Sequence, residues 1–116
     1  MSSIEVKSFS NADEVNTDFN NARIDAVNVG GQRVIQLTLQ PGWKWSNDIK
    51  PVVGTDSCQA THLGVIIAGT VKAIHNDGTE ATYTAGDAYS IQPGHDGMVV
   101  GEEPAIVYEF AGAWGE

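Results

Sequence analysis

The segment GTVKAIHNDGTEATYTAGDAYSIQPG, residues 69–94, contains short runs of alternating residues separated by strong turn signals. Asn76-Asp77-Gly78 is the strongest hairpin signal in the chain, because Asn, Asp and Gly tolerate the positive φ angles that tight hairpin turns require. Further turn signals stand at 85–87 and at Pro93-Gly94, where glycine or proline interrupts each run. The segment therefore predicts three consecutive strands, at 71–75, 80–84 and 88–92.

The same pattern of short runs and turns extends outward in both directions. Residues 32–40 place Ile35, Leu37 and Leu39 on one face of a strand, and Pro41-Gly42 ends it. Residues 10–15 predict one helical turn, and 43–54 predict an irregular stretch. No window shows sustained helical periodicity, so the chain is expected to be all-β, a sandwich or a barrel. The other predicted strands are 4–9, 23–29, 59–68, 98–100 and 105–110.

Length and composition exclude several classes of protein. The 116 residues are enough for one domain, and the net charge of −9 disfavours binding to nucleic acid or to an anionic membrane. The longest apolar runs fall short of the ~18 residues needed to span a bilayer, and residues 1–10 lack a signal-peptide apolar segment. The single cysteine, Cys58, excludes an internal disulfide. These features together predict a cytoplasmic protein.

The layout of residues 69–94 resembles the cupin superfamily, and in particular its small single-domain bacterial members of the type-2 kind. The resemblance covers about 41–110 and implies a double-stranded β-helix, or jelly-roll, barrel. It also implies one domain over 1–116, with the barrel core at about 32–110. The tracts 41–45, 54–62 and 93–96 look like a subfamily of bacterial cupins with no settled activity.

The metal motifs of this chain diverge from the cupin pattern. Counting back from Gly69, His62 stands at the usual glutamate position, Cys58 at the second histidine position and Asp56 at the first. In the second motif the usual histidine falls near Gly97, and His95 lies two residues earlier, with the same strand parity. The resemblance thus implies that Cys58, His62 and His95 face the barrel interior.

A thiolate and two imidazoles suit a divalent transition metal (Zn, Fe, Mn, Ni or Cu) better than Mg²⁺ or Ca²⁺. His62, His95 and Cys58 are therefore the candidate metal ligands. A structural interpretation stays open, because a buried cysteine is commonly a small hydrophobic residue and a histidine near a barrel mouth can bond a backbone carbonyl. On a straight strand Cys58 and His62 would be roughly 13 Å apart, so direct contact between them requires a bend.

Four further residues complete the expected site and its surroundings. Trp43, Trp45 and Asp56 are candidate residues of a ligand pocket, with burial of the tryptophans over the barrel opening or in a dimer contact as the alternative. Asp96 is a candidate hydrogen-bond acceptor that orients His95. The apolar outer positions 63, 65 and 67 predict a homodimer that forms sheet to sheet.

The function expected from the sequence is binding of a small molecule of unknown identity, with a divalent metal inside the barrel as the candidate cofactor. Two alternatives remain open: a metal-dependent cupin enzyme, either an oxygenase or an isomerase, and a metal-free sensor or regulatory module. No catalytic residue is predicted, because the fold alone does not select a reaction.

Overall fold

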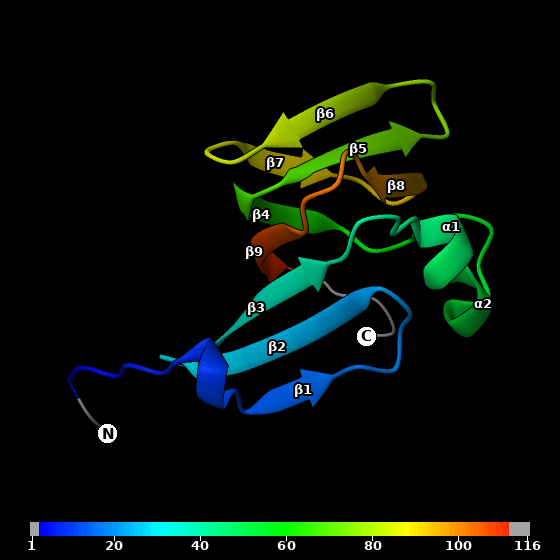
Figure 1. Ribbon diagram of the computed structural model, residues 1–116. Helices are drawn as coiled ribbons and strands as arrows, with labels where there is room; N and C mark the ends of the chain where they lie inside the picture. The colour runs from blue at the N-terminus through cyan, green and yellow to red at the C-terminus, as the bar shows by residue number, and fades with distance from the viewer. Residues whose placement is uncertain (1–2, 112–116) are drawn as a thin grey trace.

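The structure, a computed structural model that describes residues 3–111, contains two antiparallel sheets that face each other (Figure 1). One sheet has six strands in the order β1-β2-β3-β9-β4-β7, and the other has three in the order β6-β5-β8. The all-β expectation is confirmed, and so is the jelly-roll arrangement. The strands are β1 (Glu14–Asn16), β2 (Ala22–Val29), β3 (Gln32–Leu39), β4 (His62–Ala68), β5 (Thr70–His75), β6 (Glu80–Thr84), β7 (Ala88–Ile91), β8 (His95–Val99) and β9 (Ala105–Ala111).

The turns form where glycine supplies positive φ. Gly30 and Gly31, with φ of 58° and 75°, close the β2–β3 hairpin, and Gly78, with φ of 94°, closes β5–β6. In the second hairpin Ile74 pairs with Glu80 across the predicted Asn76-Asp77-Gly78 turn. The three strands predicted within 69–94 are therefore confirmed.

Several predicted boundaries differ from the structure. Residues 4–9 contain no strand, and the predicted helical turn at 10–15 is instead a single 3₁₀ turn, η1 (Phe9–Asn11), in which the Ser8 hydroxyl accepts from the Ser10 N–H. The irregular stretch 43–54 contains two one-turn helices, α1 (Trp45–Asp48) and α2 (Lys50–Val53). β4 begins at His62 instead of 59, and β8 begins at His95 instead of 98. Both of these shifts place a histidine at the first residue of a strand.

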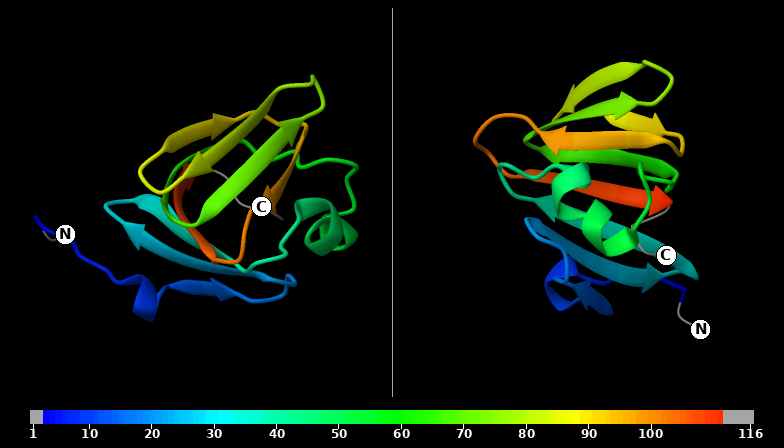
Figure 2. Two further views of the ribbon diagram at one scale, coloured as in Figure 1. Left: turned by 45° about the horizontal axis from the view of Figure 1, so that its top comes forward. Right: turned by 90° about the vertical axis from the view of Figure 1, so that its right-hand side faces the viewer.

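Alternate residues of the facing strands form the core between the two sheets. The inward side chains are mostly aliphatic, with Leu37, Ile66 and Val107 almost wholly buried. The two short helices lie beside the sheets (Figure 2), with α1 next to β8 and α2 packed against α1. None of the helices in the described residues has the length and apolar character to cross a membrane. Within this apolar interior the buried His62, His95 and Glu109 stand out, since ionisable groups are seldom buried without partners.

Candidate metal centre

Three metal-ligating side chains converge inside the barrel. The donor atoms of Cys58, His62 and His95 all lie within 4.8 Å of one another. Their residues are 2%, 4% and 5% exposed, respectively, so the cluster is shielded from bulk water. They come from three places: the loop before β4, the first residue of β4 and the first residue of β8.

Cys58 reaches this cluster because its backbone is bound to β8 and is not part of β4. Its N–H donates to the His95 carbonyl at 2.7 Å, and its carbonyl accepts from the Gly94 N–H at 2.7 Å. The chain therefore bends between residues 58 and 62, and Cys58 Sγ lies 3.6 Å from His62 Nε2. The bend that direct contact requires is thus present, because the strand starts only at His62.

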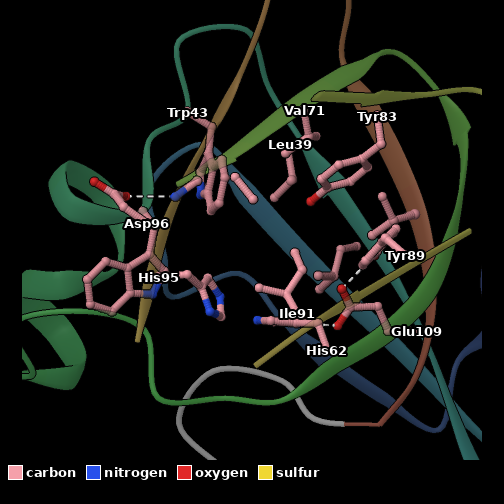
Figure 3. Close-up of a pocket in the computed structure, with 15 residues that line it drawn as sticks. Leu39, Trp43, His62, Val71, Tyr83, Tyr89, Ile91, His95, Asp96 and Glu109 are labelled. Carbon is pink, nitrogen blue, oxygen red and sulfur yellow. Dashed lines mark hydrogen bonds and ion pairs between the residues drawn. The ribbon is translucent and has the colours of Figure 1, made fainter. Parts of the chain in front are cut away.

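His62 is oriented by a buried carboxylate. Its Nδ1 lies 2.7 Å from Glu109 Oε1, and the Tyr89 hydroxyl donates to the other carboxylate oxygen, Oε2, at 2.6 Å (Figure 3). Glu109 is only 3% exposed, so both of its oxygens are engaged by protein groups in a dry environment. With Nδ1 bound to Glu109, Nε2 is the ring nitrogen that faces Cys58.

A backbone carbonyl group orients His95 in the same way, through its Nδ1 atom. Its Nδ1 lies 2.8 Å from the Gln92 carbonyl oxygen, which can only accept, so Nδ1 carries the proton. The two imidazole rings meet edge to face, with their centroids 5.0 Å apart. Each histidine is thus held by a hydrogen bond at Nδ1, an arrangement that is general among metal-binding histidines, and in His62 this directs Nε2 toward Cys58.

The charges of the cluster favour an ion pair. Burial alone would raise the pKa of the Cys58 thiol, but hydrogen bonds from His62 and His95 outweigh it and lower that pKa to about 6. For His62, burial opposes the charged ring, yet Cys58 and Glu109 together raise its pKa to about 9. Near neutral pH the pair is therefore a thiolate beside an imidazolium, and the sulfur is already in the form that binds metals.

The donor set and its spacing fit a transition metal. With metal–sulfur and metal–nitrogen distances of about 2.3 and 2.0–2.1 Å, tetrahedral geometry places sulfur and nitrogen about 3.5–3.6 Å apart. The observed distance between Cys58 Sγ and His62 Nε2 is 3.6 Å. Three protein donors of this kind leave a fourth position open, as in catalytic zinc sites.

A small cavity adjoins the cluster. The space for the centre of a water-sized molecule is about 30 Å³, and the walls are largely apolar. His62 and His95 line it together with both buried tryptophans, Trp43 and Trp45. A larger pocket of about 280 Å³ lies between the β5–β6 hairpin and β7, and it shares Ala73, Ile91 and His95 with the inner cavity.

Solved structures with the same architecture identify the fold. A protein of unknown function from Rhizobium leguminosarum has a TM-score of 0.64 at 14% identity, with 94% of this chain and 98% of that chain covered. An RmlC-like cupin from Shewanella frigidimarina has a TM-score of 0.60 at 13% identity, with 94% and 93% covered. This chain has the cupin fold. The fold that the resemblance implied is thus confirmed.

Another cupin-fold neighbour is an enzyme of greater length. The oxalate decarboxylase from Lactobacillus farciminis has a TM-score of 0.59 at 15% identity; 94% of this chain is covered but only 33% of that chain. Identities this low establish the fold alone. The sequence matches no protein-family model and no curated protein.

The other residues predicted for the site lie in different surroundings. Asp56 has a fully exposed side chain, 4.0 Å from Lys50 Nζ, and lines neither the inner cavity nor the larger pocket of this cupin. Asp96 does line the cavity (Figure 3), but its Oδ1 accepts from the backbone N–H groups of Ser46 and Gly97. The acceptor for His95 Nδ1 is the Gln92 carbonyl oxygen instead.

Sequence reasoning missed Glu109 and Tyr89. A signal for Glu109 does exist in the 105–110 strand, because Ala105, Val107 and Glu109 share the inward face by strand alternation. A carboxylate on an otherwise apolar inward face indicates a buried partner. Nothing in the spacing could identify that partner, since His62 lies 47 residues away in the chain.

Proposed function

We propose that this cupin binds one divalent transition metal through Cys58, His62 and His95, and that the metal presents an open position to a small ligand in the adjoining cavity. The observation that carries this proposal is the convergence of the three buried donor atoms within 4.8 Å. Both histidines are also bonded at Nδ1, which makes Nε2 the nitrogen available to a metal that replaces the contact between His62 and Cys58.

The residues around the site orient the histidine ligands and limit the access of water to the metal. A bound divalent metal would act as a Lewis acid toward the ligand at its open position. Glu109, held by Tyr89, fixes the ring of His62 and keeps Nδ1 engaged. The Gln92 carbonyl does the same for His95, and the largely apolar walls limit the access of bulk water to the cavity.

Metal analysis of the untagged protein tests this proposal. We expect about one equivalent of a transition metal after reconstitution and dialysis, and loss of that metal in His62→Ala and Cys58→Ser. His75→Ala is the matched control, because His75 lies at the β5–β6 hairpin, where its Nε2 is bonded to the Pro93 carbonyl at 2.8 Å. Unchanged metal content in His62→Ala, or no binding by the wild-type protein, would refute the proposal.

A further inference from the structure

We infer that the open position beside Cys58, His62 and His95 takes a neutral ligand of two or three non-hydrogen atoms that accepts a hydrogen bond from Trp45. This inference rests on the proposed metal site and names the class of ligand that the site admits. Three independent features of the cavity support it: its volume, its charge balance and a buried donor.

The volume of the cavity limits the size of the ligand. The cavity offers about 30 Å³ to the centre of a water-sized molecule. One water needs about 10–15 Å³ by the same measure, so the cavity holds the equivalent of about two or three waters. A sugar or an aromatic ring exceeds this space, and Trp43 and Trp45 are 4% and 2% exposed, buried in the cavity wall instead of standing at an open mouth.

Charge balance favours a neutral ligand. A divalent metal brings two positive charges, and the Cys58 thiolate, the Glu109 carboxylate and the Asp96 carboxylate in the cavity wall each bring one negative charge. No positive charge is then left for an anionic ligand to balance, and Glu109 lies only one histidine away from the metal position. An anionic ligand would add an unpaired charge to a buried site, at a large desolvation cost.

A buried donor sets the chemistry of the ligand's outer atom. Trp45 lines the cavity, and its Nε1 is inaccessible to solvent without a hydrogen-bond partner among residues 3–111. A buried N–H left unsatisfied is costly, and such a group commonly marks the place of a ligand or an ordered water. Indole Nε1 can only donate, so the group that satisfies it must be an acceptor.

A larger pocket lies next to the cavity and indicates the side from which a ligand enters. The pocket of about 280 Å³ between the β5–β6 hairpin and β7 shares Ala73, Ile91 and His95 with the inner cavity. It places a solvent-accessible vestibule next to the cavity, on the side that His95 lines. Because Ile91 and His95 line both spaces, we expect a small ligand to enter from this side.

Ligand binding to the Fe(II)-loaded protein under anaerobic conditions tests the inference, with three probes and electron paramagnetic resonance and absorption as readouts. Nitric oxide is neutral and diatomic, azide has three atoms and a negative charge, and imidazole is neutral but larger. We expect nitric oxide to saturate the iron, and azide and imidazole to show no binding at about 100-fold excess by isothermal titration, which is needed for them because high-spin Fe(II) gives no ordinary paramagnetic resonance signal. Binding of azide or imidazole as readily as nitric oxide would overturn the inference.

The variant Trp45→Phe tests the hydrogen bond separately. Loss of one donor is expected to accelerate nitric oxide release by about threefold to tenfold, while iron affinity stays within about twofold because Trp45 is not a ligand. Tyr108→Phe on the outer face is the control and is expected to change neither quantity. Nitric oxide release unchanged in Trp45→Phe would refute the role of Trp45. Failure of the wild-type protein to bind iron would instead refute the metal site, and this inference with it.

Discussion

Glu109 is the residue on which the orientation of the candidate metal site depends. It bridges the His62 ring and the Tyr89 hydroxyl at 2.7 and 2.6 Å, and it is almost wholly buried. Carboxylates in this position fix the tautomer and raise the basicity of a metal-binding histidine. The residue is therefore expected to control metal affinity without touching the metal.

Glu109→Gln is expected to weaken metal binding by about 10- to 100-fold, because the amide keeps the shape of the side chain but removes its charge. Isothermal titration of the metal-free protein measures this change. Glu103→Gln, in the exposed loop before β9, makes the same charge change and is expected to have no effect. Equal affinities for the two variants would contradict the positioning role of Glu109.

The coupled pair of Cys58 and His62 predicts how metal affinity depends on pH. The His62 pKa of about 9 means that a proton must leave the ring whenever metal binds below that pH. The Cys58 pKa of about 6 means that the thiol adds no second proton until the pH falls below that value. Affinity should therefore rise about tenfold per pH unit from 6 to 9 and then level off. Titrations in buffers of different ionisation enthalpy measure the released proton, and affinity independent of pH would contradict the prediction.

At the scale of elements, residues 69–94 predict their three strands well, since the turn residues alone determine where each strand ends. The boundaries of β4 and β8 could not be predicted, because they depend on the pairing of Cys58 with His95, which lie 37 positions apart in the chain. The same pairing brings Cys58 to His62, so the three candidate ligands could be proposed from the resemblance, whereas their contact could not. Glu109 reaches the site through β9, whose neighbours β3 and β4 are distant in sequence.

The β4–β9 pairing also makes Gly64 a sensitive position. A Cβ atom there would collide with the Tyr108 carbonyl and lie 2.9 Å from the Tyr89 hydroxyl, next to the Glu109 side chain. Gly64→Ala is expected to destabilise the protein by about 1–3 kcal/mol, measured by urea unfolding. Gly97→Ala is the matched control in a strand, since its nearest contact would be an ordinary 3.6 Å from the Trp43 ring. Equal stability of both variants would show that β4 and β9 do not approach as closely as described.

At the scale of the whole molecule, the outer face of β4 and β9 is apolar although the chain carries a net charge of −9. Leu63 and Phe110 are 52% and 53% exposed there, with Ile67 and Val65 on the same face of β4. Exposed apolar patches of this kind commonly mark contact surfaces. We propose that this face forms the homodimer contact expected from the sequence.

Sedimentation velocity tests the homodimer. Leu63→Asp is expected to shift the protein toward the monomer, because it places a charge in the centre of an apolar contact. Raised salt is expected to favour the dimer, because it screens the repulsion between two acidic copies. Thr82→Asp, on the exposed β6 strand, is the control. A wild-type protein that stays monomeric at high concentration would contradict the proposal.

The most direct test of the metal centre is X-ray absorption by the zinc-loaded protein, because it reports which atoms surround the metal. We expect one sulfur at about 2.3 Å and two imidazole nitrogens at about 2.0–2.1 Å, with the sulfur contribution lost in Cys58→Ser. A spectrum with only oxygen and nitrogen neighbours in the wild-type protein would contradict it.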